Sequence, residues 1–124
     1  MALPLAGIRI VEIASFVAVP AAGALLADLG ADVLKLIASG AVLAFGGAPG
    51  EREMIPEEIK AVVDVAHAHG IKVAAHAHGA QSIKDAILAG ADTIEHASLI
   101  DDEGIRLAQE HGTALSMDVY NGDW

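Results

Sequence analysis

Four glycines divide the chain into units that repeat one order of patterns. Gly30, Gly70, Gly90 and Gly112 each follow a stretch with helical spacing of apolar residues and precede a short strand-like run. Glycine is common just after the last turn of a helix, because it adopts the left-handed conformation without a steric penalty. The pattern therefore predicts an alternation of helix, glycine and strand.

The expected elements follow from these glycines and from local helix-start signals. Pro56, with Glu57 and Glu58 in the first turn, indicates a helix whose apolar residues share one stripe, and Asp101 is suited to cap another helix. The expected helices cover 20–29, a segment beginning at Pro56, 81–89 and 102–111, and the expected strands cover 8–14, 32–37, 72–77, 92–95 and 113–117.

Strands separated by helices predict a parallel sheet with right-handed crossovers. We expect one α/β domain over residues 1–124, with about five parallel strands alternating with helices. Two architectures remain open: a flavodoxin-like sandwich, with strand order 2-1-3-4-5 and helices on both faces, and half of a (β/α)8 barrel. Five strands leave two open edges, so a homodimer or higher oligomer is expected.

Charge and cysteine content exclude several functions. The chain has seven Lys and Arg against 17 Asp and Glu, a net charge of −10, and no cysteine. Binding to nucleic acid or to an anionic membrane requires a basic surface, so neither partner is expected. The absence of cysteine excludes disulfides, thiol nucleophiles and cysteine-ligated zinc. No signal peptide or membrane helix is expected, and a cytoplasmic location fits this composition.

Histidines gather where predicted strands end. His76 and His78 follow one strand and His96 follows the next. The carboxyl ends of parallel strands meet at one edge of the sheet, and imidazoles there suit a divalent cation. Ordinary hydrogen bonding by partly buried histidines is the alternative, because a His-x-His at a strand end is a weak signal by itself.

Two segments of the chain resemble two known families. Residues 3–36 resemble the N-terminus of class III CoA-transferases and alpha-methylacyl-CoA racemases, on the motifs LPLAGIRIVEIAS, PAAG and LADLGADV. Residues 31–124 resemble the amidohydrolase superfamily, in particular Xaa-Pro dipeptidases and imidazolonepropionase-like members, on VLKLIASG, VAAHAHG and DTIEHASLID. Together they indicate a chimera of a CoA-transferase-like βαβ piece and an amidohydrolase-like (βα)n piece within one domain.

The amidohydrolase resemblance implies a remnant of a metal site. It places Lys35 at the bridging carboxylated lysine, His76 and His96 at two histidine ligands, and His78 in the substrate pocket. The family's first-strand His-x-His has no counterpart, and its final aspartate, which is also the general base, would lie beyond Trp124. Lysine binds metal only as a carbamate formed from the neutral amine, which is scarce at neutral pH. We therefore expect Lys35 to stay an ammonium and Zn²⁺ to bind weakly.

These losses favour a folded, recombined chimera without evolved catalytic activity. On this interpretation we assign no catalytic residue, no cofactor-binding residue and no small-molecule substrate. Whether the chain is an enzyme stays open, although the missing ligands argue against it. Two alternatives remain: a metal-dependent amidohydrolase of peptide or amide bonds that is completed by oligomerisation, and a binding or assembly module that uses the carboxyl-end crevice of the sheet.

Overall fold

The computed structural model describes residues 8–12, 31–40, 48 and 50–117 of the chain. Its five strands are β1 (Ile8–Glu12), β2 (Ala31–Ile37), β3 (Lys72–Ala77), β4 (Thr93–His96) and β5 (Ala114–Met117). Its helices are α2 (Pro56–Ala68), α3 (Ala80–Ala89) and α4 (Asp102–His111). The predicted helix over 20–29 lies outside the described residues.

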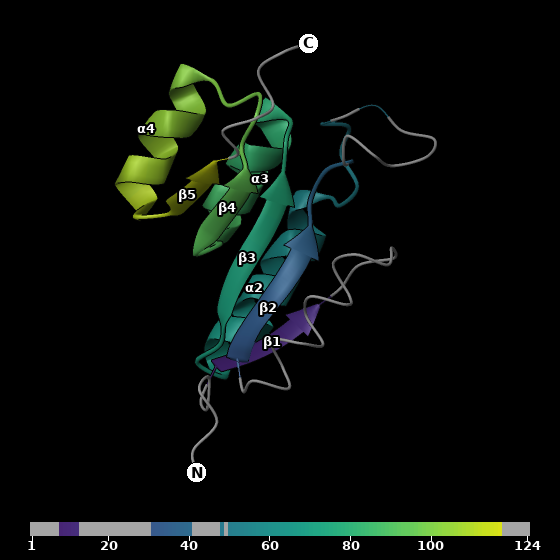
Figure 1. Ribbon diagram of the computed structural model, residues 1–124, viewed down its shortest axis with the longest axis vertical. Coiled ribbons are helices and arrows are strands. Elements are labelled where there is room, and N and C mark those ends of the chain that lie inside the picture. Colours follow the sequence, from purple (N-terminus) through teal and green to yellow (C-terminus); the bar gives the residue numbers. More distant parts are fainter. Residues whose placement is uncertain (1–7, 13–30, 41–47, 49, 118–124) are drawn as a thin grey trace.

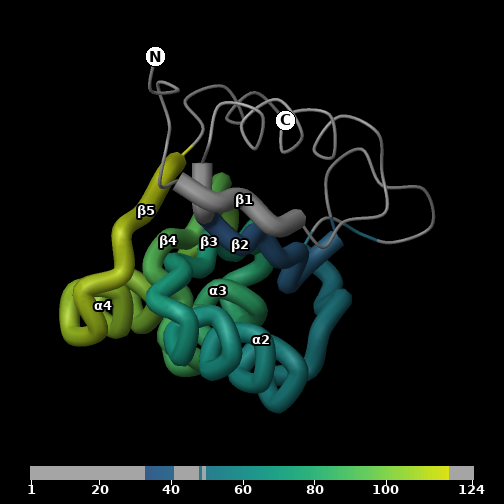
Figure 2. The backbone as a smooth tube through the Cα atoms, turned by 90° about the horizontal axis from the view of Figure 1, so that it is seen from below, coloured from purple at the N-terminus to yellow at the C-terminus, as the bar shows by residue number. Residues whose placement is uncertain are grey.

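All five strands are parallel, which confirms the predicted fold class, and their order in the sheet is β1-β2-β3-β4-β5 (Figure 1). The flavodoxin-like order 2-1-3-4-5 is therefore wrong. The described helices α2, α3 and α4 lie on the same side of the sheet (Figure 2), whereas a sandwich needs helices on both faces. A sequential order with one helix layer is the arrangement of a (β/α)8 barrel segment.

Local signals account for where the helices begin and end. Pro56 occupies the first turn of α2, and the Ile55 N–H donates to the Glu58 carboxylate at 3.0 Å. The Asp101 carboxylate caps α4 by accepting from the Gly104 N–H at 2.8 Å. Gly90 and Gly112 end α3 and α4 with φ values of 98° and 70°. These starts and stops confirm the predictions made from proline, aspartate and glycine.

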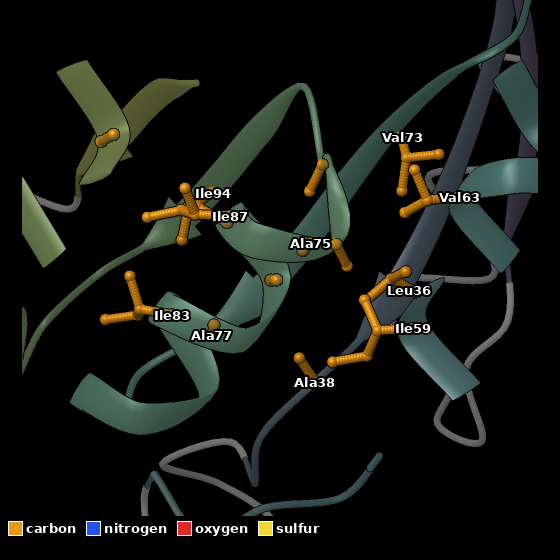
Figure 3. Close-up of a cluster of buried hydrophobic side chains, with 14 of the residues drawn as sticks. Leu36, Ala38, Ile59, Val63, Val73, Ala75, Ala77, Ile83, Ile87 and Ile94 are labelled. Atoms are coloured by element: carbon orange, nitrogen blue, oxygen red, sulfur yellow. The ribbon is translucent and has the colours of Figure 1, made fainter. Parts of the chain in front are cut away.

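The hydrophobic core lies between the sheet and its helix layer (Figure 3). Side chains on one face of the sheet pack against α2 and α3, and all of the following have at most 1% of their surface exposed: Leu36, Val73, Ala75, Ile94, Ile59, Val63, Ile83 and Ile87. Burying the leucine, isoleucine and valine side chains among them contributes roughly 1.5–3 kcal/mol each. The core therefore holds β2, β3 and β4 in fixed register.

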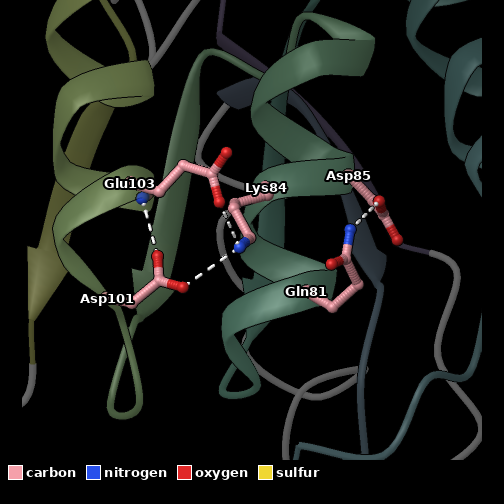
Figure 4. A network of polar contacts seen from close by, with 6 residues as sticks. Gln81, Lys84, Asp85, Asp101 and Glu103 are labelled. Atoms are coloured by element: carbon pink, nitrogen blue, oxygen red, sulfur yellow. Dashed lines mark hydrogen bonds and ion pairs between the residues drawn. The ribbon is translucent and has the colours of Figure 1, made fainter.

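A polar network joins α3 to the start of α4 (Figure 4). The Lys84 ammonium donates to the Asp101 carboxylate at 3.0 Å and to the Glu103 carboxylate at 2.7 Å. Hydrogen bonding to Glu103 and Asp101 raises the pKa of Lys84.

Within the described residues, no helix has the length and apolar character needed to cross a lipid bilayer.

Candidate metal centre

Three histidine rings converge at the carboxyl ends of β3 and β4. The ring centroids of His76 and His96 lie 4.5 Å apart, and the His78 ring lies 4.7 Å from each of them. One nitrogen of each ring lies within 4.8 Å of the other two. His76 is 8% exposed and His78 3% exposed, so two of the rings are withdrawn from bulk water.

Strand alternation explains the positions of His76 and His78. Side chains of successive strand residues point to opposite faces, so the two histidines share one face while Ala75 and Ala77 pack into the core. The register pairs His76 with Ile37 of β2 and with Glu95 of β4. His76 therefore lies on the face of the sheet opposite to α2 and α3.

His96 joins this pair through an unusual backbone conformation. Regular alternation would place its side chain with that of Ile94, on the helix-covered face. Instead His96 and the following Ala97 have φ values of 71° and 51°, in the left-handed region that residues with a side chain rarely adopt. The chain turns at this point, and the His96 ring lies against His76 and His78. Such strain costs on the order of 1–3 kcal/mol per residue and clusters at functional sites.

Short contacts hold the carboxyl end of β3 against the segments that contain Ser39 and Gly50. The buried Ser39 hydroxyl accepts a hydrogen bond from the His78 N–H at 2.8 Å. A Cβ added to Gly79 would lie 2.2 Å from the carbonyl oxygen of Gly50, so only glycine allows these two backbone segments to meet. The position of His78 is therefore set from both sides of the strand end.

Lys35 lies on the same face of the sheet as His76, but its partner there is a carboxylate. Its ammonium forms an ion pair with Glu95, the residue before His96. The Lys35 side chain is 14% exposed and that of Glu95 33%. This ion pair places opposite charges beside the three imidazoles. That Lys35 stays an ammonium when a metal is present remains a prediction.

A separate groove lies on the helix layer. Its volume is about 500 Å³, and it is lined by residues of α2 and α3: Pro56, Glu57, Lys60, Ala61, Asp64, Asp85, Leu88 and Ala89. None of these residues belongs to the histidine cluster, which lies on the opposite face of the sheet. The groove therefore does not bear on the chemistry of the candidate metal centre.

Comparison with known proteins decides which family the sequence comes from. The model of the amidohydrolase family matches residues 7–123. The chain belongs to the amidohydrolase family. The match also includes most of the segment 3–36, whose resemblance to CoA-transferases stays a prediction, as do the boundaries drawn between the two pieces.

Proteins similar to this amidohydrolase chain include an ochratoxinase and an Xaa-Pro dipeptidase. Ochratoxinase of Aspergillus niger is 40% identical over 83 residues, which are 67% of this chain and 17% of the ochratoxinase. A crystal structure of an Xaa-Pro dipeptidase with bound methionine in its active site is 40% identical, with a TM-score of 0.66 over 77% of this chain and 23% of the dipeptidase. The crystal structure of A. niger ochratoxinase is 37% identical, with a TM-score of 0.65 over 78% of this chain and 22% of that chain.

A third crystal structure is a prolidase in complex with N-methylphosphonate-L-proline. It is 34% identical to this amidohydrolase chain, with a TM-score of 0.66 over 78% of this chain and 24% of the prolidase. The chain thus spans about a quarter or less of the proteins it matches. The likeness to segments of these hydrolases agrees with a segment of a (β/α)8 barrel and not with a flavodoxin-like sandwich.

The family match corrects the functional prediction. A chimera without evolved activity was expected, but the amidohydrolase match extends over 7–123 and its relatives include a dipeptidase and an ochratoxinase. The inactive interpretation is wrong, and the alternative of a metal-dependent amidohydrolase agrees better with these findings. The ligands that this chain does not contain do not decide its function, because the chain spans only a small part of its relatives.

The structure also places each residue singled out from the sequence. His76 and His96 come together, Lys35 lies on the same face as His76, and His78 is part of the same cluster. Sequence patterns did not identify Glu95 as the partner of Lys35 or Ser98 as a neighbour of His78, whose Nδ1 lies 2.8 Å from the Ser98 hydroxyl. Side-by-side alignment of the predicted parallel strands 72–77 and 92–95 is the signal that could have revealed Glu95 as a neighbour of this face.

Proposed function

We propose that the chain forms the metal-binding part of an amidohydrolase active site, with His76 and His96 as nitrogen ligands of a divalent cation. The observation that carries this proposal is the convergence of the histidine rings at the carboxyl ends of β3 and β4. In (β/α)8 barrels this end of the sheet holds the active site. The bond that we propose to be hydrolysed is an amide.

The donor groups suit the proposed ion. Imidazole nitrogen is a common ligand of Zn²⁺, at about 2.0–2.1 Å. One nitrogen from each ring lies within 4.8 Å of the other two, so the imidazoles are close enough to be candidate ligands of one ion. A bound divalent cation would supply Lewis-acid chemistry, which activates water and polarises an amide carbonyl.

The residues of the chain contribute position, burial and charge. The sheet register fixes His76 beside Glu95, and the left-handed backbone at His96 turns its ring toward His76. The ion pair with Glu95 holds the Lys35 side chain at the same face. The proposal therefore rests on the imidazoles and not on a carbamate of Lys35.

The substrate class follows from the relatives. One similar structure is described as an Xaa-Pro dipeptidase and another as a prolidase bound to a proline phosphonate. We therefore propose dipeptides with a carboxyl-terminal proline as the first substrates to test. The net charge of −10 argues against nucleic acid as an alternative ligand, because phosphate groups would be repelled.

The test combines metal binding with hydrolysis. Zn²⁺ and Mn²⁺ are titrated calorimetrically into the parent chain, His76→Ala, His96→Ala and the control His69→Ala, which removes an exposed histidine at the end of α2. Hydrolysis of methionyl-proline is then followed with the metal present, and prolyl-methionine serves as the reversed control substrate.

We expect metal binding by the parent and by His69→Ala, and a loss of binding in both cluster variants. Hydrolysis of methionyl-proline should follow the same pattern. Equal metal affinity in all four proteins would refute the metal centre. Metal binding without hydrolysis would refute the proposed activity of this chain while leaving the metal centre in place.

A further inference from the structure

The left-handed backbone at His96 and Ala97 needs contacts that hold it in place. Neither residue is a glycine, so their φ values of 71° and 51° carry a steric cost. Such a conformation persists only where the surrounding structure over-determines it. The residues that hold the chain after β4 therefore also hold the His96 ring beside His76.

Residues 97–101, which we call the return segment, are tied to the end of β3 at their start. The Ala97 N–H donates to the Ala77 carbonyl at 3.0 Å, and the Leu99 N–H donates to the His78 carbonyl at 3.0 Å. These bonds hold the first half of the return segment across the end of β3. The second half leads to α4 and needs a separate anchor.

Asp101, the last residue of the return segment, is held from two directions. One of its carboxylate oxygens accepts from the Gly104 N–H at 2.8 Å and so caps α4. The other oxygen accepts from the Lys84 ammonium at 3.0 Å, and the same ammonium donates to the Glu103 carboxylate at 2.7 Å (Figure 4). The cap joins the return segment to α4, whereas Lys84 ties both of them to α3.

Lys84 can act as an anchor because α3 is firmly packed. Ile83 and Ile87 of the same helix are 0% exposed and belong to the hydrophobic core. The Lys84 side chain is itself 14% exposed, whereas those of Asp101 and Glu103 are 44% and 59% exposed. The lysine is thus the covered member of the network, and the two carboxylates are brought to it.

We propose that Lys84 is a positioning residue of the metal centre. By holding Asp101 against α3, it fixes the far end of the return segment and so keeps His96 and Ala97 in the left-handed conformation. The inference rests on the proposed function, in which the His96 ring is a ligand of the divalent cation. Lys84 acts through the backbone from the helix-covered side of the sheet, and it is not itself a ligand or a catalytic residue.

The first measurement needs no metal. A positive φ brings the amide and alpha hydrogens of one residue close together, so the nuclear Overhauser effect (NOE) between them is strong. We compare this NOE at Ala97 in the parent, in Lys84→Met, in Lys84→Arg and in the control Lys60→Met, which removes an exposed lysine paired with Asp64 on α2. It should be strong in the parent, in Lys60→Met and in Lys84→Arg, which keeps the charge and the donors, and weaker in Lys84→Met.

Two carboxylate variants test the path from Lys84 to the return segment. Asp101→Asn keeps an oxygen for the cap of α4, because asparagine caps helices about as well as aspartate, but it replaces an acceptor of Lys84 with an amide. Glu103→Gln changes a residue of α4 that lies outside the return segment. We expect Asp101→Asn to weaken the NOE of Ala97 as Lys84→Met does, and Glu103→Gln to leave it nearly unchanged. Asp101→Asn also decides the question if Lys84→Met does not fold.

The second measurement is the Zn²⁺ affinity of the same proteins. Lys84→Met and Asp101→Asn should bind Zn²⁺ roughly fivefold to thirtyfold more weakly, the factor that corresponds to the left-handed penalty of one residue. In Ala97→Gly that penalty is absent, so adding Lys84→Met to it should weaken binding by less than about threefold. An equal loss with and without Ala97→Gly would overturn the proposal, because Lys84 would then act on affinity without acting on the strained backbone.

The outcomes separate this proposal from the metal centre itself. If the parent binds Zn²⁺ and the NOE of Ala97 is unchanged in Lys84→Met and Asp101→Asn, Lys84 is not a positioning residue, and the centre formed by His76 and His96 stands. If the parent binds no Zn²⁺, the proposed function fails, and the NOE still decides whether Lys84 holds the left-handed backbone. Circular dichroism spectra equal to that of the parent show that any change does not come from unfolding.

Discussion

The two ends of the β3–β4 pair are stabilised in opposite ways. At the amino end, the Asp92 carboxylate accepts from the Val73 N–H at 2.8 Å and pairs with His67 at 2.9 Å, so donors meet an acceptor. At the carboxyl end, three imidazoles of the same kind lie against one another, and two residues adopt a left-handed backbone. Donor–acceptor contacts favour stability at the amino end, whereas the carboxyl end combines closely packed imidazoles with a strained backbone, the features on which the proposed metal centre rests.

The largest effect is expected from Gly79→Ala, which disrupts the carboxyl end. The added Cβ would lie 2.2 Å from the Gly50 carbonyl oxygen, so the backbone must move. We expect a loss of about 1–3 kcal/mol of unfolding free energy, as for other overpacked sites, together with loss of Zn²⁺ binding. Urea denaturation and calorimetric titration measure the two effects.

Gly70→Ala is the matched control for that substitution. Gly70 also has a positive φ, of 71°, but an added Cβ meets nothing within 4 Å. This variant should lose about 1–2 kcal/mol through backbone strain and keep its Zn²⁺ affinity. Equal Zn²⁺ affinities of the parent and Gly79→Ala would show that the contact with Gly50 does not position the cluster.

Asp92→Asn changes the amino end of the β3–β4 pair and leaves the histidine cluster at the carboxyl end intact. It removes the charge that accepts hydrogen bonds from Val73 and His67, which should cost about 1.5–3 kcal/mol of unfolding free energy, the typical range for charged hydrogen bonds. Zn²⁺ affinity should not change, because Asp92 lies at the opposite end of β4. A parallel loss of stability and affinity would mean that the two ends are coupled and the comparison is wrong.

Much of the fold was predictable because the signals are local. The bounds of β3 and α4 and the start of α2 follow from apolar runs, Pro56, the Asp101 cap and the helix-ending glycines. Strand order was not predictable in this way, because it depends on how the helices pack against the sheet. The sandwich order placed the first strand in the interior, whereas the structure has β1 at the edge.

The candidate site was predictable only in part, for a related reason. Strand ends indicated that His76 and His96 approach each other, since neighbouring parallel strands end at one edge. The face on which His96 lies depends on its φ of 71°, and no glycine or asparagine in the sequence marks that position. The closeness of Ser98 to His78 follows from the same turn, so it also required the structure.

The strain at His96 predicts a trade between stability and binding. Glycine adopts a positive φ at little cost. The free energy of unfolding of His96→Gly should therefore be about 1 kcal/mol higher than that of His96→Ala, although both variants lack the ring. Neither variant should bind Zn²⁺. Urea denaturation of the two metal-free proteins measures the difference. If the alanine variant is equally stable or more stable, the left-handed backbone is not a source of strain in this chain.

The smallest effect is expected in the pH dependence of stability. Burial disfavours the charged form of Asp92, but hydrogen bonds from Val73 and His67 and the nearby positive charges of His67 and Lys72 outweigh it, so its pKa is lowered. Its folded pKa thus lies below the unfolded value of about 3.9, and the stability it contributes is present above that pH and is lost as the pH falls through the folded pKa. Hydrogen bonds from the Gly104 N–H and Lys84 lower the pKa of Asp101 in the same direction.

Thermal melts of the parent and of Asp92→Asn between about pH 6 and pH 2 isolate the contribution of Asp92 from the general effect of protonating many carboxylates. The gap between the two melting temperatures should be constant near neutral pH and should narrow below about pH 4, because protonated aspartic acid no longer differs from asparagine in charge. Asp102→Asn, at an exposed position for which no such contacts are seen, is the control and should show no comparable gap. If the gap between the parent and Asp92→Asn instead stays constant down to pH 2, the amino end is not stabilised by the charge of Asp92, and the hydrogen bonds to Val73 and His67 act through geometry alone.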